Sequence, residues 1–144
     1  MNRRHIALTF ALAGAVLLTS CSLLRQQTML GDETPKPFAL PTTTATPKRD
    51  EVLPVASFGI RGPCAILTMS GKPELLPIWP KGYTAMSGPM YFLLTPPDGS
   101  QDVVDSEMME VHGEYLDSPP ADAVIPPECA KYPLYLVSKV INRS

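Results

Sequence analysis

The chain has 144 residues, with 12 Lys or Arg, 14 Asp or Glu and a formal net charge of -2 at neutral pH. This length accommodates one modest domain and a flanking segment. The charge is uneven, because acidic side chains outnumber basic ones in residues 51–144 and no Lys or Arg occurs between Lys81 and Lys131. Such a surface repels phosphate backbones and anionic head groups, so we expect no nucleic acid partner.

The first 20 residues have the three-part organisation of a secretory signal peptide. Arg3 and Arg4 give a positive start, residues 6–18 form a low-polarity run, and small residues follow before a cysteine. The apolar run is too short to cross a bilayer as a permanent helix. We therefore expect residues 1–20 to be removed and the mature chain to begin at Cys21.

The end of this segment, Leu18-Thr19-Ser20-Cys21, resembles the lipobox of bacterial lipoproteins. In that family the signal is cleaved before the cysteine, whose sulfur and new amino group carry acyl chains such as palmitate. The resemblance implies a covalent lipid on Cys21, no other cofactor, and attachment to the membrane of the bacterial cell envelope. In a Gram-negative host, Ser22 rather than aspartate after the cysteine is consistent with the outer membrane, facing the periplasm. A secretory signal without lipidation is the alternative.

Residues 21–50 are expected to form a flexible, disordered tether. Four prolines interrupt regular pairing, and residues 42–46 are a low-complexity run of Thr and Ala. The apolar residues have no sustained helical or alternating period, so their burial cannot offset the entropy of ordering the segment. The functional interpretation is a stand-off from the membrane, and the alternative is a plain solvated linker.

Residues 51–144 are expected to form one small, mainly β domain. Short apolar runs alternate with Pro and Gly, which is typical of an all-β fold. In chain order, the predicted strands are 52–58, 64–69, 75–79, 90–94, 109–116 and 134–141. The fifth strand is ambiguous, because its apolar residues also fit a helical spacing, but Gly113 disfavours a helix there.

Cys64 and Cys129 are the two cysteines that remain once Cys21 is assigned to lipidation. Two thiols in an oxidising compartment favour one disulfide bond. Closing a loop of this length would add roughly 4 kcal/mol to the stability by the chain-entropy estimate. Two separate buried thiols are the alternative, and a zinc site would need ligands beyond two cysteines.

The rhythm of the domain resembles that of small OB-type β-barrels in other bacterial envelope proteins. The residues that carry this resemblance are Ile78-Trp79-Pro80 with Gly82 at the end of a hairpin, and Val111 with Gly113 in a later strand. The resemblance implies a closed or partly closed barrel of five or six strands. The disulfide would then join the opening strand to the loop before the closing strand. A β-sandwich is the alternative.

No motif of a known catalytic site is recognisable in the chain. It contains no Gly-x-Ser-x-Gly elbow, Ser-x-x-Lys, His-Glu-x-x-His or phosphate-binding glycine loop. His112 would be the only histidine of the mature chain, and we interpret it as a solvent-facing strand residue between Glu110 and Glu114. The acidic residues that precede it lack the spacing of a calcium-binding loop. We therefore expect no catalytic residues, no metal and no enzymatic activity.

Two short runs are candidates for a binding surface. Residues 79–83 place Trp79 and Tyr83 around a turn, a composition that is typical of interface anchors, although a single tryptophan in a small domain is also typical of the core. Ser87-Gly88-Pro89-Met90-Tyr91 is similar to the loop by which membrane-bound inhibitors of C-type lysozyme engage that enzyme. This similarity implies inhibitory roles for Ser87 and Tyr91, although the family's downstream basic motif is missing here.

The sequence therefore predicts an envelope lipoprotein with a non-enzymatic binding or structural β domain. Its expected partner is another envelope protein or a wall component. The first alternative is an inhibitor or ligand-binding module that uses Trp79, Tyr83, Ser87 and Tyr91. The second is a carboxylate-based hydrolase, which would need two carboxylates at a fixed separation.

Overall fold

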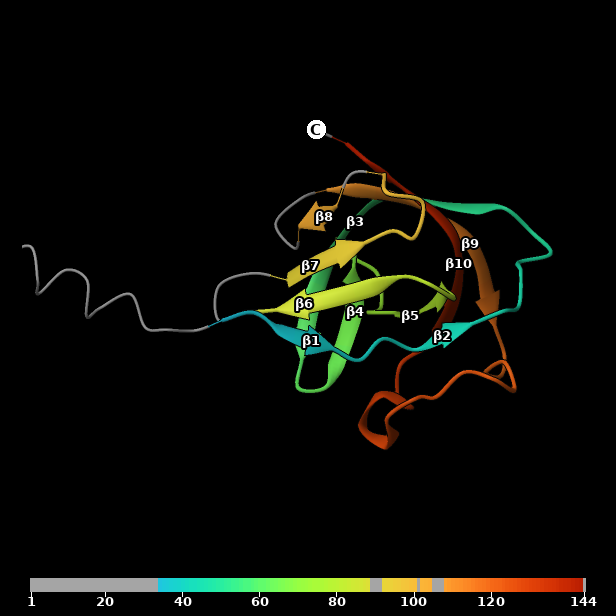
Figure 1. Cartoon of the computed structure of the whole chain (residues 1–144). Coiled ribbons are helices and arrows are strands. Elements are labelled where there is room, and N and C mark those ends of the chain that lie inside the picture. The colour runs from blue at the N-terminus through green and yellow to red at the C-terminus, as the bar shows by residue number, and fades with distance from the viewer. Residues whose placement is uncertain (1–33, 89–91, 101, 105–107, 144) are drawn as a thin grey trace, which may run out of the picture. The chain divides into compact units, whose positions relative to one another are not determined.

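The computed structural model describes residues 34–88, 92–100, 102–104 and 108–143. The signal segment, Cys21, the first part of the expected tether and Tyr91 lie outside these residues. The described residues form ten strands and one short 3-10 helix, η1, and Figure 1 shows their arrangement. The elements are β1 (Lys36–Phe38), β2 (Thr42–Thr43), β3 (Glu51–Arg61), β4 (Cys64–Thr68), β5 (Leu76–Pro80), β6 (Thr84–Ser87), β7 (Phe92–Thr95), β8 (Val103–Val104), β9 (Met109–Leu116), η1 (Pro127–Cys129) and β10 (Leu134–Asn142).

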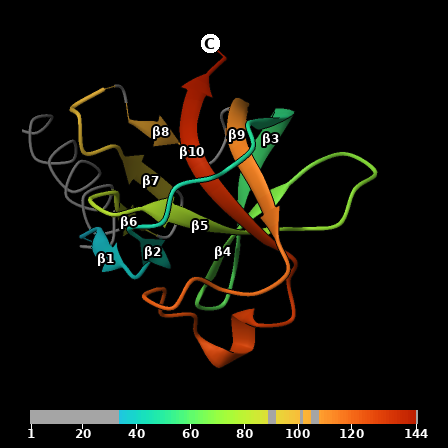
Figure 2. The same ribbon diagram turned by 90° about the vertical axis from the view of Figure 1, so that its right-hand side faces the viewer.

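The strands belong to two sheets, so the predicted mainly β class is confirmed. The smaller sheet has the order β1-β6-β7-β8, and the larger one has the order β2-β5-β10-β9-β3-β4. Figures 1 and 2 show β6, β7 and β8 side by side, with the long strands β3, β9 and β10 forming a separate group. Each of the six predicted strands has a counterpart among β3, β4, β5, β7, β9 and β10.

The larger sheet does not close into a barrel, so that part of the expectation is corrected. The edge strand β4 meets the chain just before β5 through a single bridge between Leu67 and Leu75. On the same edge of β5, Trp79 donates its N–H to Pro41 instead. Pro77 lies between them and has no N–H to donate, so the ladder to β4 stops at this point.

The folded part begins at residue 34, so the predicted boundary at residue 51 is corrected. We call residues 34–50 the strap. Its strand β1 pairs antiparallel with β6, and β2 pairs parallel with β5. Phe38 and Leu40 pack against the main core, which supplies the burial that their isolated positions in the sequence did not predict.

Two cores lie on opposite faces of the strands β4, β5 and β10. Alternate residues of each strand face the main core between the sheets; Trp79 of β5 does so, as does Leu75 directly before this strand. The intervening residues, Leu76 and Ile78 in β5, face a second core on the outer side. Residues 117–133, which we call the cap, cover this outer core.

The predicted disulfide is confirmed and fastens the cap to the strands. Cys64 at the start of β4 is bonded to Cys129 in η1, with a Cα–Cα distance of 5.6 Å. Both cysteines are buried in the outer core. Because the bond joins positions 65 residues apart, it constrains a large part of the domain.

Gly113 allows β9 to approach β10 closely. A Cβ atom at this position would collide with the backbone carbonyl of Leu136 and with the ring of Tyr135. A glycine is therefore required at this position, where β9 pairs with β10. The predicted strand over residues 109–116 is confirmed.

Candidate functional site

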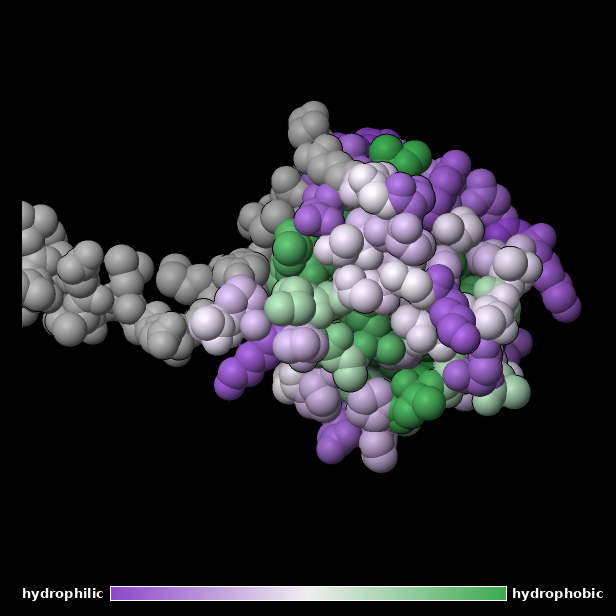
Figure 3. Space-filling view, in the orientation of Figure 1, coloured by the Kyte–Doolittle hydropathy of each residue, from purple (hydrophilic) through white to green (hydrophobic). Residues whose placement is uncertain are grey.

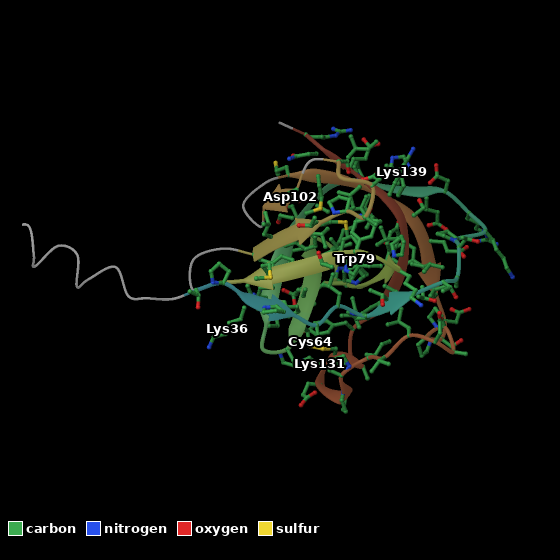
Figure 4. All side chains as sticks on the ribbon, viewed as in Figure 1. Lys36, Cys64, Trp79, Asp102, Lys131 and Lys139 are labelled. Carbon is green, nitrogen blue, oxygen red and sulfur yellow. A yellow bond between two sulfur atoms is a disulfide. The ribbon has the colours of Figure 1, made fainter. Side chains whose placement is uncertain are left out.

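Trp79 does not lie on the surface, so its interpretation as an exposed anchor is wrong. It faces inward from β5, has no exposed surface, and packs its ring against those of Phe58 and Tyr83 at 5.6 Å and 5.4 Å. Figure 4 shows its side chain among the packed side chains of the domain. The alternative of a core tryptophan is the correct one, and Trp79 cannot contact a partner from this position.

The other predicted surface residues are not brought together with an exposed tryptophan. Tyr83 is half-buried, and burial followed by the nearby Asp98 carboxylate raises the pKa of its hydroxyl. Ser87 ends β6, where it pairs with Lys36 on one side and Phe92 on the other. Tyr91 lies outside the described residues.

His112 is buried, which corrects its interpretation as a solvent-facing residue. It is 8% exposed, and each ring nitrogen contacts a carboxylate: Nδ1 lies 3.2 Å from Asp50 and Nε2 lies 2.6 Å from Glu110. The Arg143 guanidinium, and then His112, lower the pKa of Glu110. The sequence missed this arrangement because Asp50 belongs to the strap, which was expected to be disordered.

The contacts of His112 decide what this cluster can do. A general base needs a free nitrogen within hydrogen-bonding reach of its substrate. Both nitrogens of His112 already face carboxylate oxygens, and little of the ring is exposed. The arrangement therefore fastens the end of the strap and the C-terminal Arg143 to β9.

The cap is fastened to the strap by a second polar cluster. The Asp122 carboxylate accepts hydrogen bonds from the Thr43 hydroxyl and from both the amide and the hydroxyl of Thr44. These bonds, that of Thr43 first, lower the pKa of Asp122 to about 2. Thr43 is buried, so this contact also satisfies a polar group that would otherwise be costly to bury.

A groove of about 290 Å³ lies between the cap and the adjoining ends of β9 and β10. It is lined by Leu116, Asp117, Pro119, Ile125, Ala130, Tyr132, Pro133 and Leu134. Most of these residues are apolar, and Asp117 is the charged member. Figure 3 shows apolar surface over the region where Figure 1 places the cap. The groove can accommodate an apolar side chain or ligand group, and its loop residues had no periodic pattern that could have predicted it.

A second hollow, of about 250 Å³, lies beside β3 and β4. It is lined by Ala56, Ser57, Thr68, Met69, Ser70 and Met108. The hydroxyls of Ser57 and Thr68 are hydrogen-bonded to each other at 2.9 Å, so they stabilise the pairing of the two strands.

Neither a metal-binding group nor a membrane-spanning helix is found among the described residues. Over the part of the chain that the structure describes, no group of three or more His, Cys, Asp or Glu side chains is placed to hold a metal ion. Within the same residues, no helix has the length and apolar character needed to cross a bilayer.

Comparison with known proteins finds no match to a family model, to a curated protein or to a solved structure.

Proposed function

We propose that the chain is a lipid-anchored protein of the bacterial cell envelope, whose β domain binds or supports another envelope component and is not an enzyme. The observation that carries the proposal is the buried Cys64–Cys129 disulfide. Disulfides persist in oxidising compartments outside the cytoplasm. The lipobox-like run that ends at Cys21 supplies the matching export signal and the lipid.

The non-enzymatic part of the proposal is supported by the state of the polar groups. Both nitrogens of His112 face carboxylates, and the Asp122 carboxylate is engaged by two threonines. These groups hold the strap and the cap in place, and their contacts leave no imidazole nitrogen for proton transfer.

The proposed contact surface is the groove beside the cap. The cap is held by a disulfide and by Asp122, so the groove is preorganised and a partner does not have to order it. Its apolar lining fits an apolar side chain of an envelope protein or wall component.

The OB-type resemblance also favours this location. In OB-type domains, ligands bind over the second and third strands and beside the loops that join strands one to two and four to five. Strand β3 pairs antiparallel with both β4 and β9, and β5 pairs parallel with β10. These pairings match those of an OB-type domain whose strands one to five are β3, β4, β5, β9 and β10. The cap joins β9 to β10 and therefore corresponds to the loop between strands four and five. Its side chains cover the outer face of β4 and β5, so the groove at its edge is the accessible part. The assignment of the cap to this loop is an analogy between folds.

The resemblance to lysozyme inhibitors is not part of the proposal. Ser87 lies in a strand with neighbours on both sides, whereas the resemblance requires it in an exposed loop. A lysozyme assay with the purified domain checks this directly, and inhibition at micromolar concentration would restore that alternative.

Fractionation of cells tests the anchor. Replacing Cys21 by Ser should move the protein from the membrane fraction to the soluble fraction, whereas Ser22→Ala should leave it membrane-bound. Unchanged fractionation of the Cys21→Ser protein would refute lipid attachment at this residue.

Site-specific crosslinking tests the groove. A photoreactive residue at Ile125, in the groove, should capture one reproducible partner in intact envelopes, and the same residue at Lys139, on β10, should not. Equal capture patterns from both positions would refute the groove as the contact surface.

A further inference from the structure

The strap occupies the outer edge of both sheets. Strand β1 pairs with β6 over three residues, from Lys36 opposite Ser87 to Phe38 opposite Ala85. Strand β2 pairs with β5 over two residues. Next to these pairs, Trp79 and Lys81 donate their backbone N–H groups to the strap carbonyls of Pro41 and Thr43, each at 2.9 Å. The strap therefore supplies a short edge strand to each of the two sheets.

The side chains of the strap complete the main core. The Phe38 ring packs edge-on against Phe92 at 5.3 Å, and Leu40 packs against the same core. Phe92 and Trp79 are both fully buried. Removing the strap would expose an apolar seat between β5 and β6, so this part of the fold is incomplete without a strand in that position.

The last part of the strap, which we call the hinge, connects its two strands to the rest of the domain. Residues 44–50 join β2 to β3, and all of them except the half-buried Pro47 are exposed. The hinge is held by side-chain contacts of Thr44 and Asp50 and by one bond from the Lys48 amide to Glu114. Seven residues span at most about 25 Å when extended, which is enough to carry a strand to an adjacent molecule.

We propose that the strap of one copy of the chain can occupy the seat on β5 and β6 of a second copy, giving a strand-exchanged dimer. The two copies have the same sequence, so the exchanged form reproduces each strap contact that the single chain makes. Concentration and the conformation of the hinge then decide between the two forms. The proposal concerns the folded domain and holds whether or not Cys21 carries a lipid. If it does, confinement to a membrane raises the local concentration and favours the dimer.

Disulfide trapping between two differently tagged chains tests the exchange. One full chain carries Cys21→Ser with Lys36→Cys, and the other carries Cys21→Ser with Ser87→Cys, so that Cys21 cannot form the bridge. Lys36 and Ser87 are opposite each other in the β1–β6 ladder, and facing residues of an antiparallel pair lie within the range of a disulfide. The two chains are mixed, unfolded and refolded together at high concentration. No reductant is added, so the native Cys64–Cys129 disulfide stays intact. The mixture is then oxidised.

The expected product is a heterodimer at about twice the mass of the chain, which disappears on reduction. A single chain with both substitutions should form the same bridge internally and confirms that the geometry is competent. For a matched control, Lys139→Cys replaces Ser87→Cys, because Figure 4 places Lys139 far from Lys36 and Lys139 is exposed, whereas Ser87 is half-buried. This control pair should give at least tenfold less heterodimer.

Two results would overturn the proposal. One is internal bridging in the double variant without heterodimer in the mixture. The other is an equal yield of heterodimer from the Lys139 control, which would mean random collision. The emission of Trp79, the only tryptophan of the chain, verifies that each variant has a folded core.

Discussion

The cap and the strap both cover apolar faces of the same strands, but they are fastened in different ways. The cap covers the outer core and is joined covalently to β4 through Cys64–Cys129. The strap covers the main core and is held by short strand pairings, packing and polar side chains. A small domain can therefore combine one cover that is joined covalently with another that is held by noncovalent contacts alone.

The two covers are also joined to each other. Asp122 of the cap accepts hydrogen bonds from Thr43 and Thr44 of the strap. The cap therefore helps to hold the strap, and the strength of this link depends on the charge of the Asp122 carboxylate. We expect the contributions to stability to decrease in this order: the disulfide, the Phe38 ring, the Asp122 carboxylate and the Asp50 contact of the hinge.

Removing the disulfide should have the largest effect on stability. Replacing both Cys64 and Cys129 by Ala removes the constraint on a 65-residue separation, and we expect a loss of about 4 kcal/mol. Urea unfolding of the double variant and of the parent measures the difference. A loss below about 1 kcal/mol would show that the cap is held by packing instead.

Shortening Phe38 to Ala should loosen the strap while the cap stays in place. The ring packs on Phe92 and is partly buried, so we expect a loss of about 2 kcal/mol and a red shift of Trp79 emission. The exposed Lys36→Ala on the same strand is the control and should change stability by no more than about 0.5 kcal/mol. Equal effects of the two substitutions would contradict a role for the ring in holding the strap.

The link between the covers should depend on pH. The pKa of Asp122 is about 2 in the folded chain, below its ordinary value of 3.8, so the ionised form is stabilised by folding. Its contribution is complete above pH 4 and is lost as the pH falls through about 2. Asp122→Asn should therefore flatten the dependence of the urea midpoint on pH between 4 and 2. An unchanged slope would remove Asp122 from the account.

The smallest effect is expected at the end of the hinge. The Asp50 side chain is 64% exposed although it contacts His112, and exposed ion pairs contribute little. We expect Asp50→Asn to change the free energy of unfolding by no more than about 0.5 kcal/mol in urea titrations. A loss above about 2 kcal/mol would mean that the hinge is fixed and would weaken the case for exchange.

Much of the fold was predictable from patterns along the chain. The short apolar runs between Pro and Gly residues predicted the strands, and the two remaining cysteines predicted the disulfide. The strap could not be predicted, because Phe38 and Leu40 gain their burial from β6 and β7, which are distant in sequence. The incomplete closure of the sheet depends on Pro77, whose effect is clear once the edge that it faces is known.

The candidate site was predicted less well for the same reason. Trp79 has the composition of an interface anchor, and only its inward position in β5 assigns it to the core. His112 is buried by Asp50 from the strap, and the groove is built from loop residues that have no period. Local patterns predicted elements, whereas burial depended on which distant segments cover them.

Hydrogen exchange at two amides of one strand tests the central claim most directly. In β5, the Leu76 amide donates to Pro133 at the end of the cap, and the Trp79 amide donates to Pro41 of the strap. Both residues are buried, so exchange requires opening of the contact. If the strap is the removable cover, Trp79 should exchange at least tenfold faster than Leu76, in a process that depends weakly on denaturant. Equal protection of the two amides would show that the strap opens only with the whole domain, and would contradict the account.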